Sequence, residues 1–262
     1  MKANTRSPLK DKPLRLPGQS LEEERRKLFE DKLEMPGLAA ILAVLLTSME
    51  WWRYYAERPP QPVAFSVFAF GFVAFAAWRF WRLVPKLRAL RQGVEGERAV
   101  GQFLERLRES GYHVFHDVMG DGFNIDHVAI GPAGIFTIET KTWSKPLKGD
   151  ARVICEGDSL RVGSLEPDRN PLIQAKAQAA WLKQLLSAST GKAYGARAVL
   201  LFPGWYVEQG PGTTREVWVL EPKALPAFLA KESTVLKKED IALASYHLSR
   251  FIREEERRRA AL

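Results

Sequence analysis

The chain has 262 residues, a length that suits one sizeable domain with extensions better than two full domains. Its formal charge of +8 favours an anionic partner, nucleic acid or an acidic membrane surface, without choosing between them. Cys155 is the single cysteine, which excludes an intrachain disulfide bond and zinc sites of the Cys₂His₂ and Cys₄ classes.

Residues 1–34 form a basic leader. Prolines at three positions (Pro8, Pro13 and Pro17) predict that this leader is partly disordered. Residues 20–23, SLEE, match a capping box and predict that a short amphipathic helix, LEEERRKLFEDKL, begins there. We expect this helix to lie near a membrane surface, as an anchor rather than as a site.

Two uncharged apolar runs follow, within residues 35–84. A bilayer span needs ~20 mostly apolar residues. The run over 59–78 meets that length, whereas the run over 35–49 does so only if Glu50 and the aromatic residues after it lie at the interface. Because the connection over 57–62 is short, the sequence predicts an antiparallel transmembrane hairpin of two helices.

Basic residues around the two runs predict the orientation of this hairpin. Nine Lys or Arg residues precede the first run, two lie between the runs, and five follow the second run. Cytoplasmic flanks carry the excess of Lys and Arg, so both termini are expected in the cytoplasm. The alternatives are a buried hairpin of a soluble protein and a cleaved signal peptide. The second run has no polar face, which disfavours the buried hairpin. The basic leader is too long for a signal peptide, and LTSMEWW at 46–52 offers no small-x-small cleavage site, which disfavours the signal peptide.

Residues 85–262 are predicted to form one α/β domain. Residues 93–110 place apolar side chains at spacings of three and four, which predicts an amphipathic helix with Glu97 toward its buried side. Alternating patterns then predict three strands, at 112–118, 124–130 and 134–143. The downstream patterns predict a hairpin at 152–162 and a helix at 171–187. They then predict two strands, at 197–202 and 216–220, and two helices, at 223–231 and 239–254.

The helix over 171–187 is expected to begin at a capping Asn170 followed by proline. Its inner stripe is expected to consist of four residues four positions apart: Ile173, Ala177, Trp181 and Leu185. Gln174 and Gln178 would then flank this stripe, one step round the helix.

Charged residues lie inside two of the apolar strands. Burial of a lone carboxylate costs several kcal/mol, so such a group is usually paired or bound to a metal. Asp126 and Glu139 lie on adjacent strands joined by a turn, and Lys141 shares a face with Glu139. Two carboxylates and the main-chain carbonyl of Thr140 would suit Mg²⁺, and Glu97 could add a carboxylate. The alternative is a buried ion pair between Lys141 and either acid.

These residues fall in segments that resemble a known family. GVEGE at 93–97, NIDHVAIGPAGIFTIETKTW at 124–143 and NPLIQA at 170–175 are similar to motifs of the nuclease-related (NERD) domain, within the PD-(D/E)xK nuclease superfamily. The resemblance covers residues 93–202. It implies an αβββαβ core, a central mixed sheet flanked by helices, which the transmembrane hairpin precedes. Ile125 stands before Asp126, where the superfamily name has proline.

The resemblance also implies an activity, Mg²⁺-dependent hydrolysis of phosphodiester bonds, with Mn²⁺ as an alternative ion and DNA as the expected substrate. The catalytic residues it implies are Glu97, Asp126, Glu139, Lys141 and Gln174. The metal ligands would be Asp126, Glu139, the backbone carbonyl of Thr140 and, in addition, Glu97.

Other polar and aromatic residues have a simpler structural interpretation. His113, His116 and Asp117 could hold a metal, but exposed strand positions are the favoured interpretation. His127 is expected to be a structural histidine, and Gln178 a surface or packing residue. Two aromatic residues after residue 204 could stack on bases or pack within the fold: Trp205 and Tyr206.

The sequence therefore predicts a membrane-anchored nuclease domain that faces the cytoplasm and binds nucleic acid. One alternative is a catalytically inactive, membrane-anchored scaffold that keeps the fold and binds nucleic acid or protein. Another is a membrane-assembly protein in which the hairpin is the functional part.

Overall fold

The computed structural model describes residues 13–58, 61–145, 151–157, 159–162, 170–210 and 216–261. Packing divides the chain into two units. We call Ser20–Val94 the hairpin unit, and the residues up to Gln19 together with Glu95–Leu262 the sheet domain.

The hairpin unit consists of long helices. Helix α1 (Gln19–Phe29) leads through a π-helical turn (Glu30–Glu34) directly into α2 (Met35–Tyr55). The expected leader helix and the first apolar run therefore form one continuous helical path, in which Pro36 lies just after the π-helical turn. Residues 59 and 60 of the predicted connection lie outside the described residues.

Helix α3 (Pro62–Leu104) continues without a break from the second apolar run into the predicted amphipathic helix. Proline in a helix interior removes one hydrogen bond, yet the helix passes through Pro85. The boundary between the two units falls inside α3, between Val94 and Glu95.

Polar contacts join α2 and α3 within the hairpin unit. The hydroxyl of Thr47 donates to the carbonyl of Phe65 (2.9 Å), and Trp51 Nε1 donates to Ser66 Oγ (3.3 Å). Glu50 is buried, and its Oε2 accepts from the main-chain N–H of Gln61 (3.2 Å). These contacts hold the two helices together near the connection.

Most apolar side chains of the hairpin point outward. Gln19–Tyr55 and Pro62–Ser110 are long and apolar enough to cross a membrane, judged by length and composition, and only 6% of the apolar window in each is buried. This chain therefore does not bury the hairpin in a core of its own, as the soluble alternative would require.

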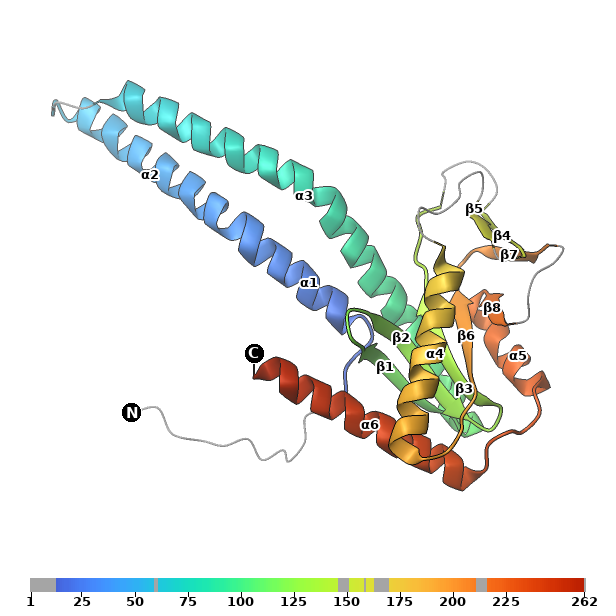
Figure 1. Cartoon of the computed structure of the whole chain (residues 1–262). Coiled ribbons are helices and arrows are strands. Elements are labelled where there is room, and N and C mark those ends of the chain that lie inside the picture. Colours follow the sequence, from blue (N-terminus) through green and yellow to red (C-terminus); the bar gives the residue numbers. More distant parts are fainter. Residues whose placement is uncertain are drawn as a thin grey trace. The chain divides into compact units, whose positions relative to one another are not determined.

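The sheet domain is built on a five-stranded mixed sheet, as predicted (Figure 1). Its order is β1-β2-β3-β6-β8, with antiparallel pairs from β1 to β3 and parallel pairs from β3 to β8. The strands span His113–Met119, Asn124–Gly131, Gly134–Thr140, Ala196–Leu201 and Val217–Leu220. All seven residues of β3 are buried, because it is the central strand and helices cover both faces.

Helices α4 (Pro171–Thr190) and α6 (Lys238–Ala260) cover one face of this sheet. The C-terminal part of α3 and helix α5 (Leu225–Lys231) pack on the other face, so the domain has an α/β layered architecture. Two 3₁₀ segments join these elements, Glu105–Ser110 and Pro222–Ala224.

A second, three-stranded sheet has the order β5-β4-β7. It contains the predicted hairpin, β4 (Arg152–Glu156) and β5 (Ser159–Val162), and a strand that the sequence did not predict, β7 (Tyr206–Gln209). Tyr206 is exposed in β7, whereas the neighbouring Trp205 is buried and donates to the carbonyl of Trp143.

The expected inner stripe of α4 is wrong by one step round the helix. Ile173 is 68% exposed. The buried stripe consists instead of small and branched residues, Leu172, Ala175, Ala179, Leu182 and Leu186. Because α4 crosses between parallel strands β3 and β6, close packing selects its smaller face. The predicted cap is present, with Asn170 Oδ1 accepting from the N–H of Leu172 (2.9 Å).

Residues 13–18, which we call the N-terminal strap, pack on the sheet domain, although the leader was predicted to be partly disordered. Arg15 is buried, and its Nε donates to Asp117 Oδ2 (2.6 Å). Its Nη1 lies 3.5 Å from Glu256 Oε1. Pro17 lies so close to Gly101 that a Cβ there would be 2.5 Å from its Cγ. Residues 1–12 of the leader lie outside the described residues.

Candidate functional site: an acidic cluster at the end of strand β3

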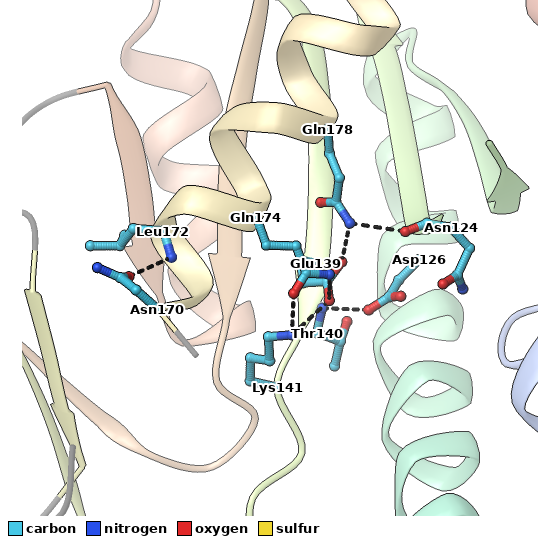
Figure 2. A network of polar contacts seen from close by, with 9 residues as sticks. All are labelled: Asn124, Asp126, Glu139, Thr140, Lys141, Asn170, Leu172, Gln174 and Gln178. Atoms are coloured by element: carbon cyan, nitrogen blue, oxygen red, sulfur yellow. Dashed lines mark hydrogen bonds and ion pairs between the residues drawn. The ribbon is translucent and has the colours of Figure 1, made fainter. Parts of the chain in front are cut away.

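Strands β2 and β3 bring Asp126 and Thr140 into contact. The antiparallel register pairs His127 with Ile138, and Asp126 lies one residue beyond that pair, at the same end of the sheet as Glu139. The main-chain N–H of Thr140 donates to Asp126 Oδ2 at 2.7 Å (Figure 2). Asp126 is therefore held at the carboxyl end of β3 by the backbone of the next strand.

Glu139 is oriented by hydrogen bonds to both of its oxygens. Its Oε1 accepts from Lys141 Nζ (2.7 Å) and from Gln174 Nε2 (2.9 Å), and its Oε2 accepts from Gln178 Nε2 (2.7 Å). Figure 2 shows both glutamines reaching from α4 toward this carboxylate. Lys141 also lies within 3.3 Å of Gln174 Oε1, so the lysine, the glutamine and the glutamate form one cluster.

Gln178 belongs to this cluster, although we expected a surface or packing residue. It is 2% exposed and donates to the carbonyl of Asn124 as well as to Glu139. The sequence analysis did not predict this role, because it placed the buried stripe of α4 one step round the helix. The available signal was its spacing of four from Gln174, which places both amides on one side of α4.

Glu97 reaches the same region from helix α3 and is buried, whereas Glu95 is exposed, as predicted. Its carboxylate accepts a hydrogen bond from the backbone of Gly18, and its Oε2 has no partner within the described residues. Burial raises the pKa of Glu97 to about 8, and the charges of Asp117 and Glu139 add to the increase.

Asp126 responds in the same way. Burial raises its pKa well above the usual value, and the charges of Glu139 and Glu97 raise it further, against the opposing charge of Lys141. Glu97, Asp126 and Glu139 thus share one buried region, and the charge of Lys141 opposes theirs. The repulsion between such carboxylates is reduced either by protonation or by a bound cation.

The donor set fits a hard divalent cation. All donors are oxygens, and Glu97 Oε2 is a buried acceptor without a partner within the described residues. No group of three or more His, Cys, Asp or Glu side chains in the described part of the chain is gathered to hold a metal. Carboxylate and main-chain carbonyl oxygens, together with water, are the donors that Mg²⁺ accepts in proteins, and the residues at this end of β3 are of that kind.

Comparison with known proteins matches this part of the chain to a family. Residues 92–203 match the family model described as the nuclease-related domain, NERD, as the motifs predicted. This chain carries a nuclease-related domain. The match is consistent with the PD-(D/E)xK nuclease superfamily and includes every residue of the cluster.

An uncharacterized protein of Bacillus anthracis is 34% identical to this chain over 74 residues. The aligned part is 26% of this chain and 33% of that protein, so the chain spans about a third of the length of this curated relative. No solved structure matches the chain.

A run of hydrogen bonds leads from the acidic cluster of the nuclease-related domain to the N-terminal strap. Gln178 joins Glu139 to the carbonyl of Asn124, and Asn124 Nδ2 donates to Asp117 Oδ1 (3.2 Å). Asp117 in turn accepts from Arg15. The strap therefore contacts the cluster by two routes, through this run and through Gly18 on Glu97.

The histidines of the nuclease-related domain form no metal site with Asp117. His113 is exposed, as expected. Asp117, in contrast, is fully buried and forms an ion pair with Arg15, and His116 is mostly buried. His116 Nδ1 lies 2.9 Å from His127 Nδ1, and its Nε2 lies 2.8 Å from Glu105 Oε1. Burial lowers the pKa of both histidines, which favours their neutral forms.

Substitution of Glu97 by glutamine is expected to remove a pH dependence of stability in the metal-free protein. Because the folded-state pKa is raised from 4.5 to about 8, the favourable contribution of this group is complete below pH 4.5 and is lost as the pH rises through 8. Chemical unfolding in EDTA between pH 5 and 9 should show that the free energy of unfolding of the variant increases relative to that of the wild type as the pH rises. The exposed Glu95→Gln is the matched control, and a constant difference between Glu97→Gln and wild type would contradict the assignment.

Substitution of Gly96 by alanine is expected to destabilise the sheet domain. A Cβ at Gly96 would lie 1.9 Å from Thr142 Oγ1, where helix α3 approaches the chain just after Lys141. Overpacking typically costs about 1–3 kcal/mol, which exceeds the gain of about 1 kcal/mol from alanine in a helix. Thermal unfolding should show a loss of stability, whereas Gly195→Ala, which meets no atom within 4 Å, should show none.

Proposed function

We propose that this chain is a membrane-anchored nuclease that hydrolyses phosphodiester bonds of DNA, with Mg²⁺, on the cytoplasmic side. The observation that carries the proposal is the convergence of Asp126, Glu139, Lys141 and Gln174 at the end of β3. The order of elements, α3, β1 to β3, α4 and β6, supports an αβββαβ nuclease-like core within the matched family region.

Asp126, Glu139 and the carbonyl of Thr140 would hold the cation, with Glu97 as a further carboxylate. When bound, Mg²⁺ would supply Lewis-acid activation of the phosphate and of an attacking water. The protein supplies positioning and charge. Lys141 Nζ, 2.7 Å from Glu139, can move to the phosphate and stabilise the negative charge that develops on its oxygens.

Gln174 and Gln178 have different roles in this proposal. Gln178 is buried and keeps Glu139 in one orientation by donating to its Oε2. Gln174 is exposed and contacts both Glu139 and Lys141. When the lysine moves to the substrate, the amide of Gln174 can donate a hydrogen bond to a phosphate oxygen. The exposed glutamine is therefore assigned to substrate binding and the buried one to positioning.

The formal charge of +8 supports DNA binding through the phosphate backbone, with an affinity that falls as salt increases. The two apolar helices and the excess of Lys and Arg at their outer flanks support a hairpin that crosses the membrane with both termini in the cytoplasm.

Cleavage by the full chain in lipid nanodiscs tests the proposal. Supercoiled plasmid DNA should be nicked or linearised with Mg²⁺ or Mn²⁺ and should stay intact with EDTA, and a matched RNA should be cut more slowly. If DNA stays intact with either ion while the protein is folded and binds DNA, the nuclease proposal is wrong.

The inactive scaffold remains the second candidate, because one observation favours it. Asp126 Oδ2 and both oxygens of Glu139 already accept hydrogen bonds from the protein, as they would in a structural ion cluster. The scaffold predicts DNA binding of equal strength with Mg²⁺ and with EDTA, and no cleavage in either.

A further inference from the structure

A pocket of about 750 Å³ lies within the hairpin unit, between α1 and the part of α3 that follows the apolar run. One part of its wall is apolar and consists of Phe29, Phe80, Val84 and Leu87. None of these residues belongs to the acidic cluster or to the family match, which begins at residue 92. The pocket is therefore a feature of the hairpin unit alone.

The rest of the wall is charged, with a positive excess. Four arginines line the pocket, Arg25, Arg26, Arg88 and Arg91, against two acids, Glu22 and Glu23, so the net charge of the lining is 4 − 2 = +2. Pairing within the lining is exposed to solvent, as in the ion pair of Arg25 with Glu22. Exposed ion pairs contribute little to stability, so a phosphate can replace the glutamate at little cost.

Along both helices, the apolar residues of the lining lie nearer to the apolar runs and the basic residues lie farther from them. On α1, Phe29 lies nearer to the apolar run and Arg25 farther from it, and on α3, Phe80 lies nearer and Arg88 farther. At about 1.5 Å per residue, Phe80 and Arg88 are roughly 12 Å apart along the helix. The lining thus changes from apolar to cationic in the direction away from the apolar runs, as a bilayer changes from hydrocarbon to headgroup.

We propose that this pocket binds an anionic phospholipid, with its phosphate on the arginines and the start of its acyl chains against the apolar wall. The proposal rests on the membrane embedding of the hairpin and is independent of the nuclease activity. Arginine suits this role because its planar guanidinium group binds phosphate oxygens in a bidentate manner. The apolar wall favours a lipid over nucleic acid, whose sugar-phosphate backbone offers nothing to fill it.

Native mass spectrometry of the detergent-purified full chain, after incubation with mixed phosphatidylglycerol and phosphatidylcholine, tests the proposal. The wild type should retain phosphatidylglycerol, and Arg88→Gln combined with Arg91→Gln should retain it about tenfold less, as expected for the loss of charge-assisted hydrogen bonds. Arg82→Gln combined with Arg79→Gln removes the same charge on α3 outside the pocket and should retain the lipid as the wild type does.

Two further measurements decide what the pocket recognises. Short-chain phosphatidylglycerol should bind to the wild type, and glycerol phosphate, which lacks the acyl chains, should not. Equal lipid retention by the pocket double variant and the wild type would overturn the proposal, as would displacement of the lipid by a short DNA duplex. Extraction of the chain from membranes by alkaline carbonate would instead show that the hairpin is not embedded, a failure of the anchoring proposal itself.

Discussion

Replacement of Asp126 by asparagine is expected to lower DNA cleavage by roughly 10²–10³-fold, the usual loss when one electrostatic group is removed from an active site. Asparagine has the same shape, and its side-chain oxygen can still accept the hydrogen bond from Thr140. The change therefore removes one negative charge from the cluster with little effect on packing. Initial rates of plasmid nicking at fixed Mg²⁺ measure the loss.

Asp121→Asn is the matched control, since it makes the same chemical change at an exposed position before β2. It should cleave at the wild-type rate. Asp126→Asn should also unfold at the wild-type temperature or above it, because burial and the neighbouring acids raise the pKa of Asp126. Wild-type cleavage by the Asp126→Asn variant would remove this residue from the mechanism.

Replacement of Arg15 by alanine is expected to destabilise the sheet domain by about 3–5 kcal/mol, the typical cost of breaking a buried ion pair by removing one partner. Arg15 and Asp117 have side chains only 5% and 0% exposed, and their contact distance is 2.6 Å. Without Arg15, the buried carboxylate of Asp117 loses a charged partner and keeps the hydrogen bond from Asn124 (3.2 Å). Chemical unfolding of the full chain measures the loss.

A double variant separates the loss of the ion pair from the loss of packing. Asn is one of the residues that tolerate the positive φ of Asp117 (52°), so Arg15→Ala with Asp117→Asn should recover part of the lost stability. Arg250→Ala breaks an exposed pair with Glu254 and should have little effect on stability. An equal cost for Arg15→Ala and Arg250→Ala would show that the strap does not stabilise the domain.

The strap also determines how the nuclease proposal should be tested. A fragment that begins after the hairpin would lack Arg15, which neutralises Asp117, and Gly18, which donates to Glu97. Loss of activity in such a fragment would therefore not distinguish an inactive site from an incomplete domain. The full chain is the appropriate protein for the cleavage assay.

Local patterns were sufficient where the decisive contacts lie within a few residues. Alternation along β3 placed Glu139 and Lys141 on one side, and their side chains do form an ion pair. Helical spacing separated the buried Glu97 from the exposed Glu95. The same reasoning failed for α4, since two candidate faces were both apolar and only the packing on β3 and β6 selected the smaller one. That error left Gln178 predicted as a surface or packing residue rather than as a hydrogen-bond donor to Glu139.

The sequence by itself determined the two apolar helices, the mixed α/β order and the family, because hydrophobic periodicity and short motifs depend only on neighbouring residues. Tertiary structure alone decided that the N-terminal strap belongs to the sheet domain. It also decided that Gln178 orients Glu139. The physical reason is that these contacts join residues far apart in the chain, such as Arg15 and Asp117, and no local pattern encodes such a pairing.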